Sequence, residues 1–206
     1  TKSKYTRQPE DAMCCFHEHA LPFFKHCASR YAILENYHTP CVGNTWPNRD
    51  TFLCGHSYGL TDNEIGFRNR YQLNLLTSAA GSPDNTKIYS PAAAISMAYL
   101  STHGHNMFRS EDDFVADCAT GALPKFSFLE PCYSYDAKNK MDGTSLHPYT
   151  CMSPASSQAY LLKLYNALQD NGLLEKTMMI ITFDESGNCF DTKGPQPTLP
   201  LVSMKQ

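Results

Sequence analysis

Thr45, Asn48 and Arg49 lie within five positions of one another and enclose Trp46 and Pro47. Proline suits the first turn of a helix, so the segment predicts a helix start whose free N–H groups and positive dipole end face an anion. Asn48 and Arg49 add donors suited to phosphate oxygens. Thr45 becomes a nucleophile if a metal or a base removes its proton, and the alternative is that Thr45 only caps the helix.

Two adjacent acids, Asp184 and Glu185, follow directly after the apolar run 178–183 (MMIITF). Neighbouring carboxylates repel each other and lose hydration at the end of a strand, so a positive group is expected beside them. A divalent metal ion with oxygen ligands would supply that charge. The alternative is a solvated loop with an acidic helix start.

Three short apolar runs must position these residues: 31–34 (YAIL), 126–129 (FSFL) and 178–183. Each is rich in β-forming residues and is bounded by polar or turn residues, which is typical of buried parallel strands. In parallel sheets, ligands bind beyond the carboxyl ends of the strands. The runs are followed by Glu35-Asn36, Glu130-Pro131 and Asp184-Glu185. The sequence therefore predicts that carboxylates gather at one edge of the sheet.

Helix signals separate the three runs. Ser110 and Asp113 resemble a capping box, with Gly121 at the far end. Ser90-Pro91 and Ser153-Pro154 each place a capping hydroxyl before a proline at the first helical position. Apolar residues then recur at helical spacing until Asn171-Gly172, at Tyr160, Leu161, Leu164, Tyr165 and Leu168. Strands that alternate with helices predict an α/β domain with a largely parallel sheet flanked by helices.

The composition bounds the class of protein. The 206 residues suit one domain, and no repeat or linker divides them. A net charge of −3 with scattered basic residues gives no electrostatic basis for nucleic-acid binding. No apolar run approaches the roughly 20 residues that span a bilayer. Nine cysteines without CxxC spacing favour an oxidising compartment, so we expect a secreted or extracytoplasmic protein.

Longer blocks of the sequence carry a resemblance. They are 21–59 (LPFFKHCASRYAILENYHTPCVGNTWPNRDTFLCGHSYG), 121–133 (GALPKFSFLEPCY), 145–154 (SLHPYTCMSP) and 161–191, which contains ITFDE. In their content and order they resemble the phosphoesterase family of phosphatidylcholine-type phospholipases C and related acid phosphatases, in the alkaline phosphatase superfamily. The resemblance implies an alkaline-phosphatase-like fold, a divalent metal cofactor and a phosphate ester substrate, with phospholipids among the candidates.

The resemblance also implies roles for single residues. Thr45 matches the family's nucleophile, which takes the phosphoryl group and also contacts metal. Asn48 would hold a nonbridging phosphate oxygen, and His147 would donate a hydrogen bond or a proton to the phosphate or the leaving group. Asp184 and Glu185 match the acidic pair that binds metal.

Arg49 has two interpretations, contact with the substrate or a brace that pairs with an acid. The sequence also departs from the family pattern. The histidine after the acidic pair is Ser186 here, and the later Asp-His is Asp191-Thr192. The family's upstream Glu-Asn metal-binding pair and its last strands have no counterpart, so we expect a chain that is incomplete at both ends. The second hypothesis is accordingly a catalytically impaired or vestigial phosphoesterase-like binding module.

Overall fold

The computed structural model describes residues 16–41, 44–63, 74–78, 85–90, 96, 99, 107–133, 143–146, 154–185 and, as backbone, 201–203. Its helices are α1 (Pro22–Arg30), α2 (Thr45–Cys54), α3 (Leu75–Ser78), α4 (Glu111–Thr120) and α5 (Pro154–Asp170), with 3₁₀ turns at Glu18–Ala20 and Leu174–Lys176. Its strands are β1 (Ala32–Ile33), β2 (Thr86–Tyr89), β3 (Phe108–Arg109), β4 (Phe126–Leu129), β5 (Met179–Ile181) and β6 (Leu201–Ser203).

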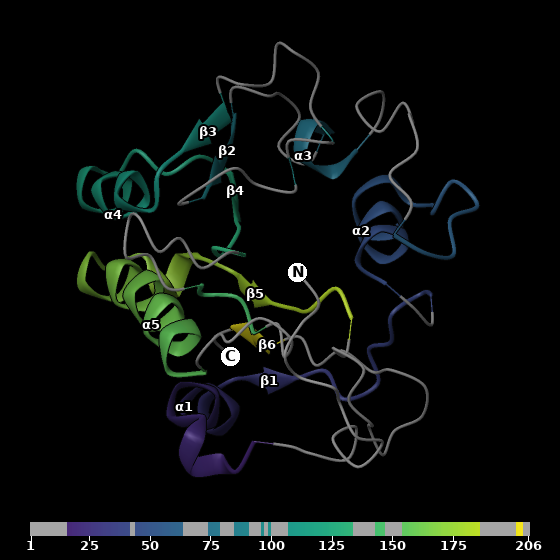
Figure 1. The fold of residues 1–206 in the computed structure, drawn as a ribbon. Helices are drawn as coiled ribbons and strands as arrows, with labels where there is room; N and C mark the ends of the chain where they lie inside the picture. The colour runs from purple at the N-terminus through teal and green to yellow at the C-terminus, as the bar shows by residue number, and fades with distance from the viewer. Residues whose placement is uncertain are drawn as a thin grey trace.

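A parallel sheet carries the fold. Its strand order is β3-β2-β4, and β2 is parallel to both of its neighbours. The chain leaves β3 at one edge, crosses through α4, and enters β4 at the other edge (Figure 1). Parallel strands require such a crossover. The predicted α/β class with a parallel sheet flanked by helices is therefore confirmed.

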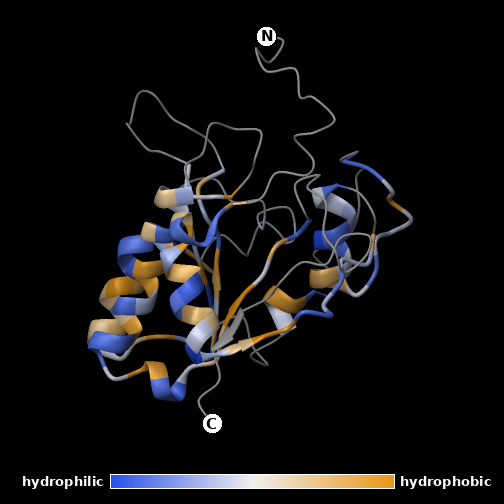
Figure 2. Cartoon of the chain, turned by 90° about the horizontal axis from the view of Figure 1, so that it is seen from below, coloured by the Kyte–Doolittle hydropathy of each residue, from blue (hydrophilic) through white to orange (hydrophobic). Residues whose placement is uncertain are grey.

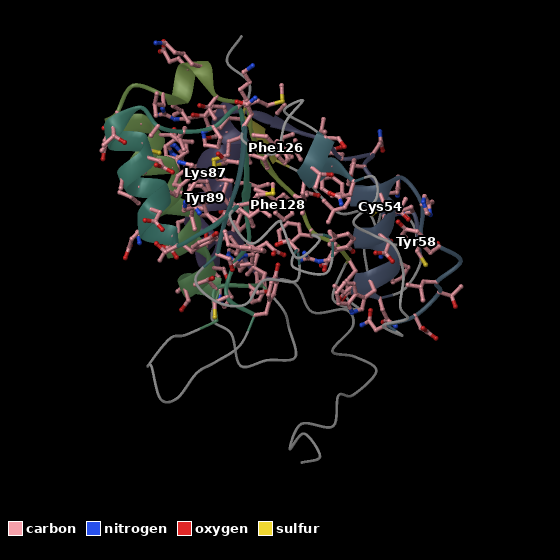
Figure 3. All side chains as sticks on the ribbon, turned by 90° about the horizontal axis from the view of Figure 1, so that it is seen from above. Cys54, Tyr58, Lys87, Tyr89, Phe126 and Phe128 are labelled. Carbon is pink, nitrogen blue, oxygen red and sulfur yellow. The ribbon has the colours of Figure 1, made fainter. Side chains whose placement is uncertain are left out.

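The two faces of this sheet pack against different helices. Tyr89 of β2 packs with Phe114 of α4 and Leu164 of α5, whereas its neighbour Ile88 packs with Leu53 of α2. Successive strand residues point to opposite faces, so this alternation places α4 and α5 on one face and α2 with α3 on the other. Figure 3 shows Lys87 and Tyr89 on the side of α4, and Figure 1 shows α2 on the opposite side of the strands.

A second three-stranded sheet has the order β1-β6-β5, and β6 is antiparallel to both neighbours. The runs 31–34 and 178–183 were predicted as buried parallel strands, and this detail is wrong. β6 lies between β1 and β5, and both residues of β1 are exposed. The run 126–129 coincides with β4 and is parallel to β2, as predicted.

Local signals determine the helices well. The capping box predicted at Ser110 and Asp113 begins α4, and Gly121 ends it in the left-handed conformation with φ +70°. The helical spacing before Asn171-Gly172 corresponds to α5, which buries Leu164 and Leu168. Figure 2 shows both hydrophobic and hydrophilic segments on these helices, as expected for helices with one buried side. The predicted cap at Ser153 and the first turn after Ser90 lie outside the described residues.

Candidate active site

The candidate nucleophile stands at the start of α2. Thr45 is the first residue of the helix, and Asn44, with extended backbone, occupies the cap position without a side-chain cap hydrogen bond. The interpretation of Thr45 as the cap is therefore wrong, whereas the first helical turn predicted at Trp46 and Pro47 is present, with Thr45 as its first residue. The backbone N–H of Trp46 donates to Asn63 Oδ1 at 3.0 Å, so a side chain from a later loop approaches this helix end.

Asn48 secures the segment that precedes the helix. Its side chain is 2 % exposed. Oδ1 accepts from the Cys41 N–H at 2.9 Å, and Nδ2 donates to the Asn44 carbonyl at 3.2 Å. The amide thus fixes the backbone on both sides of residues 42 and 43. The predicted contact of Asn48 with a phosphate oxygen stays a prediction.

Arg49 joins α2 to two segments that are distant in sequence. Its Nη1 donates to Glu130 Oε1 at 2.8 Å, just after β4, and its Nε donates to Asp184 Oδ2 at 2.9 Å, after β5. Its Nη2 donates to the Tyr133 hydroxyl at 2.8 Å. The planar guanidinium suits such multiple contacts, because its donors are fixed in one plane. Two of the carboxylates predicted at the sheet edge therefore meet at one cation.

Glu130 is the most enclosed charged member of this cluster, with 1 % of its surface exposed. Besides Arg49, Oε1 accepts from the Tyr133 hydroxyl at 3.0 Å. Oε2 accepts from both the backbone N–H and the hydroxyl of Ser96. These four hydrogen bonds match the roughly four acceptor positions of a carboxylate. Glu130 is thus fixed at both of its carboxylate oxygens.

Electrostatics favour an ionised Arg49 beside a neutral Tyr133. Burial lowers the pKa of Arg49, but the opposing effects of Tyr133, Asp184 and Glu130 outweigh it, and the pKa rises above its ordinary value. Burial raises the pKa of Tyr133, which the neighbouring Arg49 offsets only in part. The cluster therefore holds one cation between two carboxyl groups and a phenol.

The predicted site residues are described to different extents. Asp184, with 28 % of its side chain exposed, and the partly buried Glu185 follow β5. Thr45 is one helical turn before Arg49, and residues four apart share a side of a helix, so the ion pairs of Arg49 bring the Thr45 turn toward the same edge. His147 and Ser186 lie outside the described residues.

A divalent metal can be tested against these donors. Asp184, Glu185 and the Thr45 hydroxyl offer the hard oxygen atoms that such ions prefer. However, Asp184 Oδ2 is paired with Arg49. Within the part of the chain that the structure describes, no group of three or more His, Cys, Asp or Glu side chains could hold a metal ion. The described residues therefore do not make a complete metal site.

Sequence reasoning missed several members of the cluster. The sequence predicted Glu130 at the sheet edge but assigned it no role, and it assigned no role to Ser96 or Tyr133. It also assigned no role to Asn63, which contacts the start of α2. The alternation of β4 gave one usable signal, because Phe126, Phe128 and Glu130 share a face of the strand. A carboxylate that continues an apolar strand face on the α2 side requires a partner there.

The fold thus joins a hydroxyl-bearing helix start to acids that follow two strands. The sequence profile of the Phosphoesterase family matches residues 1–106 and 60–204. These matches cover most of the chain, so the chain belongs to the Phosphoesterase family.

Curated relatives agree with this assignment. The chain is 25 % identical to non-specific phospholipase C6 of Arabidopsis thaliana over 198 residues, which covers 93 % of this chain and 37 % of that protein. It is 27 % identical to non-specific phospholipase C4 of the same plant over 188 residues, covering 85 % of this chain and 33 % of that protein. The chain thus spans about a third of the length of these relatives.

Proposed function

We propose that the protein is a metal-dependent hydrolase of phosphoric esters, of the phospholipase C or acid phosphatase type, with Thr45 as its nucleophile. The observation that carries the proposal is Arg49, which ties the helix beginning at Thr45 to acids after β4 and β5. The hydroxyl and the predicted acid pair thereby come from segments held at one edge of the fold. Relatives named non-specific phospholipase C support a phospholipid as the substrate class.

The proposed chemistry has two displacements. The Thr45 hydroxyl gives its proton to solvent as Oγ forms a bond to phosphorus and the bond from phosphorus to the leaving oxygen breaks. The resemblance to the family assigns the proton taken by the leaving alcohol to His147. Water then attacks phosphorus and returns a proton to His147, the bond to Oγ breaks, and Oγ takes a proton from solvent as the phosphate product leaves. The backbone N–H of Thr45 and the positive end of the α2 dipole would stabilise the phosphoryl oxygens, since the Trp46 N–H donates to Asn63 Oδ1 and Pro47 has no N–H.

The metal belongs to the proposal as well. A bound divalent cation would lower the pKa of the Thr45 hydroxyl, with Asp184, Glu185 and Thr45 as its ligands on this chain. Metal analysis of the purified protein tests this dependence, together with p-nitrophenyl phosphate hydrolysis before and after treatment with a chelator. Turnover that survives complete removal of metal would contradict it.

Thr45→Ala tests the nucleophile. We expect turnover of p-nitrophenyl phosphate to fall by about 10³-fold or more, because no other hydroxyl would take over the attack. Thr51→Ala is the matched control on the same helix, since the Thr51 hydroxyl bonds the Pro47 carbonyl and serves only the helix. Retained turnover in Thr45→Ala, with measurable turnover in the parent, would remove the assignment.

A noncatalytic phosphoesterase-like module is the second candidate. Its specific support is that Asp184 is engaged by Arg49 and that the described residues do not make a complete metal site. A folded sample that binds no divalent metal and hydrolyses no p-nitrophenyl phosphate at any pH would favour the module. Metal-dependent hydrolysis that requires Thr45 would favour the enzyme.

Secretion remains a prediction. Cys27, Cys41 and Cys118 are free thiols, so they give no disulfide bond as support for an oxidising compartment. Locating the protein in its source cells tests the expected compartment directly. Among the described helices, none has the length and apolar character that a membrane crossing needs.

A further inference from the structure

Glu130 has no role in the chemistry described so far, yet it is the best-fixed charged group in the described residues around Arg49. It is 1 % exposed, whereas its fellow acid Asp184 is 28 % exposed at the side chain. Both share one guanidinium. The two acids therefore differ: Glu130 is buried inside the protein, and Asp184 is partly exposed to solvent.

The contacts of Glu130 engage both of its carboxylate oxygens and its backbone. Ser96 donates its backbone N–H and its hydroxyl to Oε2, while Arg49 and Tyr133 donate to Oε1. The Glu130 N–H also continues the sheet by donating to the Tyr89 carbonyl at 3.0 Å. A group held by backbone and side chain together gives Arg49 a fixed reference point on the sheet.

Arg49 connects Glu130 to two parts of the predicted site, the Asp184 carboxylate and the helix α2. Its Nη1 is held by Glu130, and its Nε is directed to Asp184. Its backbone lies one turn after Thr45 on α2. A shift of the guanidinium would therefore move both the Asp184 carboxylate and the start of the helix. Catalytic groups held less accurately lose rate even when they remain present.

We propose that Glu130 is a positioning residue of the phosphoester site, acting through Arg49 on the Asp184 carboxylate and on the helix that begins at Thr45. The inference rests on the proposed function, because it assigns Thr45 and Asp184 to the same reaction. It gives Arg49 the bracing role, because each of its three guanidinium nitrogens already donates within the protein.

Glu130→Gln is the test variant, because it keeps the shape and removes the charge. Its amide group must present N–H donors either to Arg49 and Tyr133 or to Ser96, all of which are donors themselves. We expect kcat for p-nitrophenyl phosphate to fall by about 100-fold while KM stays within about threefold, as for lost transition-state alignment. We also expect faster hydrogen exchange at the backbone amides of α2.

Asp117→Asn is the matched control. Asp117 likewise joins a helix to the sheet, since its Oδ2 accepts from Lys87 Nζ at 2.6 Å and from the Tyr89 hydroxyl at 2.7 Å. It lies in α4, on the other face of the sheet. The control should leave kcat within about twofold and leave α2 exchange unchanged, because additive effects are expected between separated sites.

The outcomes separate this inference from the proposed function. A Glu130→Gln variant with raised KM and unchanged kcat would assign the cluster to substrate binding and overturn the inference. If the parent and Thr45→Ala hydrolyse the substrate equally, the proposed function fails, and α2 exchange still decides the bracing role. Unchanged α2 exchange in Glu130→Gln overturns it.

Arg49→Lys covers the case in which Glu130→Gln does not fold. Lysine keeps the charge, but its single ammonium group cannot donate to Glu130, Asp184 and Tyr133 in the geometry of a planar guanidinium. The inference expects a kcat loss with KM retained, together with faster exchange in α2. Parent-like kcat and parent-like exchange in Arg49→Lys would overturn it.

Discussion

The two faces of the parallel sheet differ in the groups that are buried against them. We call the side of α4 and α5 the scaffold face and the side of α2 and α3 the site face. The scaffold face buries a continuous cluster of apolar or aromatic residues: Tyr89, Phe114, Cys118, Tyr160, Leu164, Ala167 and Leu168. The site face has an apolar cluster too, with Leu53, Leu76 and Ile88, and most of the buried polar groups lie beside it: Asn48, Asp50, Asn74, Ser96 and Glu130. Ser157 and Gln158 of α5 are also buried.

This difference separates packing from function. Burying polar groups costs free energy unless each finds a partner, so packing alone would not choose them. On the site face the partners are specific: the Tyr99 hydroxyl donates to Asp50 at 2.7 Å, and Arg49 donates to Glu130 at 2.8 Å. Buried polar groups that are held by side chains from distant segments therefore indicate where chemistry is organised, independently of any motif.

The largest expected effect on stability is at the site face. Arg49→Met leaves Glu130 buried without its cation, and removal of one partner from a buried ion pair costs about 3–5 kcal/mol. Lys87→Met on the scaffold face should cost less than Arg49→Met, because Asp117 keeps 16 % of its side chain exposed whereas Glu130 keeps 1 %. Urea unfolding of both variants measures the contrast. Equal losses would mean that burial does not distinguish the two clusters.

Much of the scaffold face could be predicted from the sequence, because its signals are local. The capping box of α4 spans Ser110 to Asp113, and the apolar spacing of α5 needs only one helix. β2 was missed, since Thr86–Tyr89 alternates little in character and becomes a strand by pairing with β3 and β4. Pairing of this kind depends on distant residues and leaves no local pattern.

On the site face, too, some features could be predicted from nearby residues and others depend on distant ones. The helix start at Thr45 and the order of Asn48 and Arg49 within it follow from nearby residues. The partners of Arg49 lie 81 and 135 positions away, at Glu130 and Asp184. Residue type predicted that Arg49 would meet an acid or a phosphate, but only the packing of α2 against the ends of two strands determines which.

Leu164→Ala should give the next largest effect and should affect stability alone. Leu164 is 1 % exposed in the scaffold cluster, and large-to-small changes in a core cost about 2–5 kcal/mol. Leu162→Ala is the control, since Leu162 is 45 % exposed and should change stability by less than about 0.5 kcal/mol. Thermal unfolding and turnover at a temperature where both fold provide the measurements. A loss of kcat in Leu164→Ala at a temperature where the variant is folded would contradict the prediction that the scaffold face affects stability alone.

Alkaline pH should weaken the scaffold face by a smaller amount. Burial raises the pKa of the Cys118 thiol from its ordinary value of 9.0 to about 11. The fold therefore favours the neutral thiol, so its stabilising contribution is complete below pH 9 and is lost as pH rises through 11. Cys118→Ala should lose less stability than the parent over this interval in urea unfolding. Parallel pH profiles for the two proteins would contradict the assignment to Cys118.

The smallest effect concerns the first turn of α4. The Ser110 hydroxyl accepts from the Asp113 N–H at 3.1 Å, and Asp113 Oδ2 accepts from the Ser110 N–H at 2.8 Å. Ser110→Ala removes this cap and should cost about 1 kcal/mol. Ser29→Ala should cost less, because the Ser29 hydroxyl is exposed and bonds only the His26 carbonyl within α1.

Hydrogen exchange shows how far that loss of the cap extends. The faster exchange should be confined to α4, because the cap contacts only its own helix and the sheet separates α4 from α2. Exchange that also rises in α2 would mean that the two faces unfold as one unit. Glu130, whose carbonyl accepts from the scaffold-face Tyr160 hydroxyl at 3.2 Å, would then be the contact through which they are coupled.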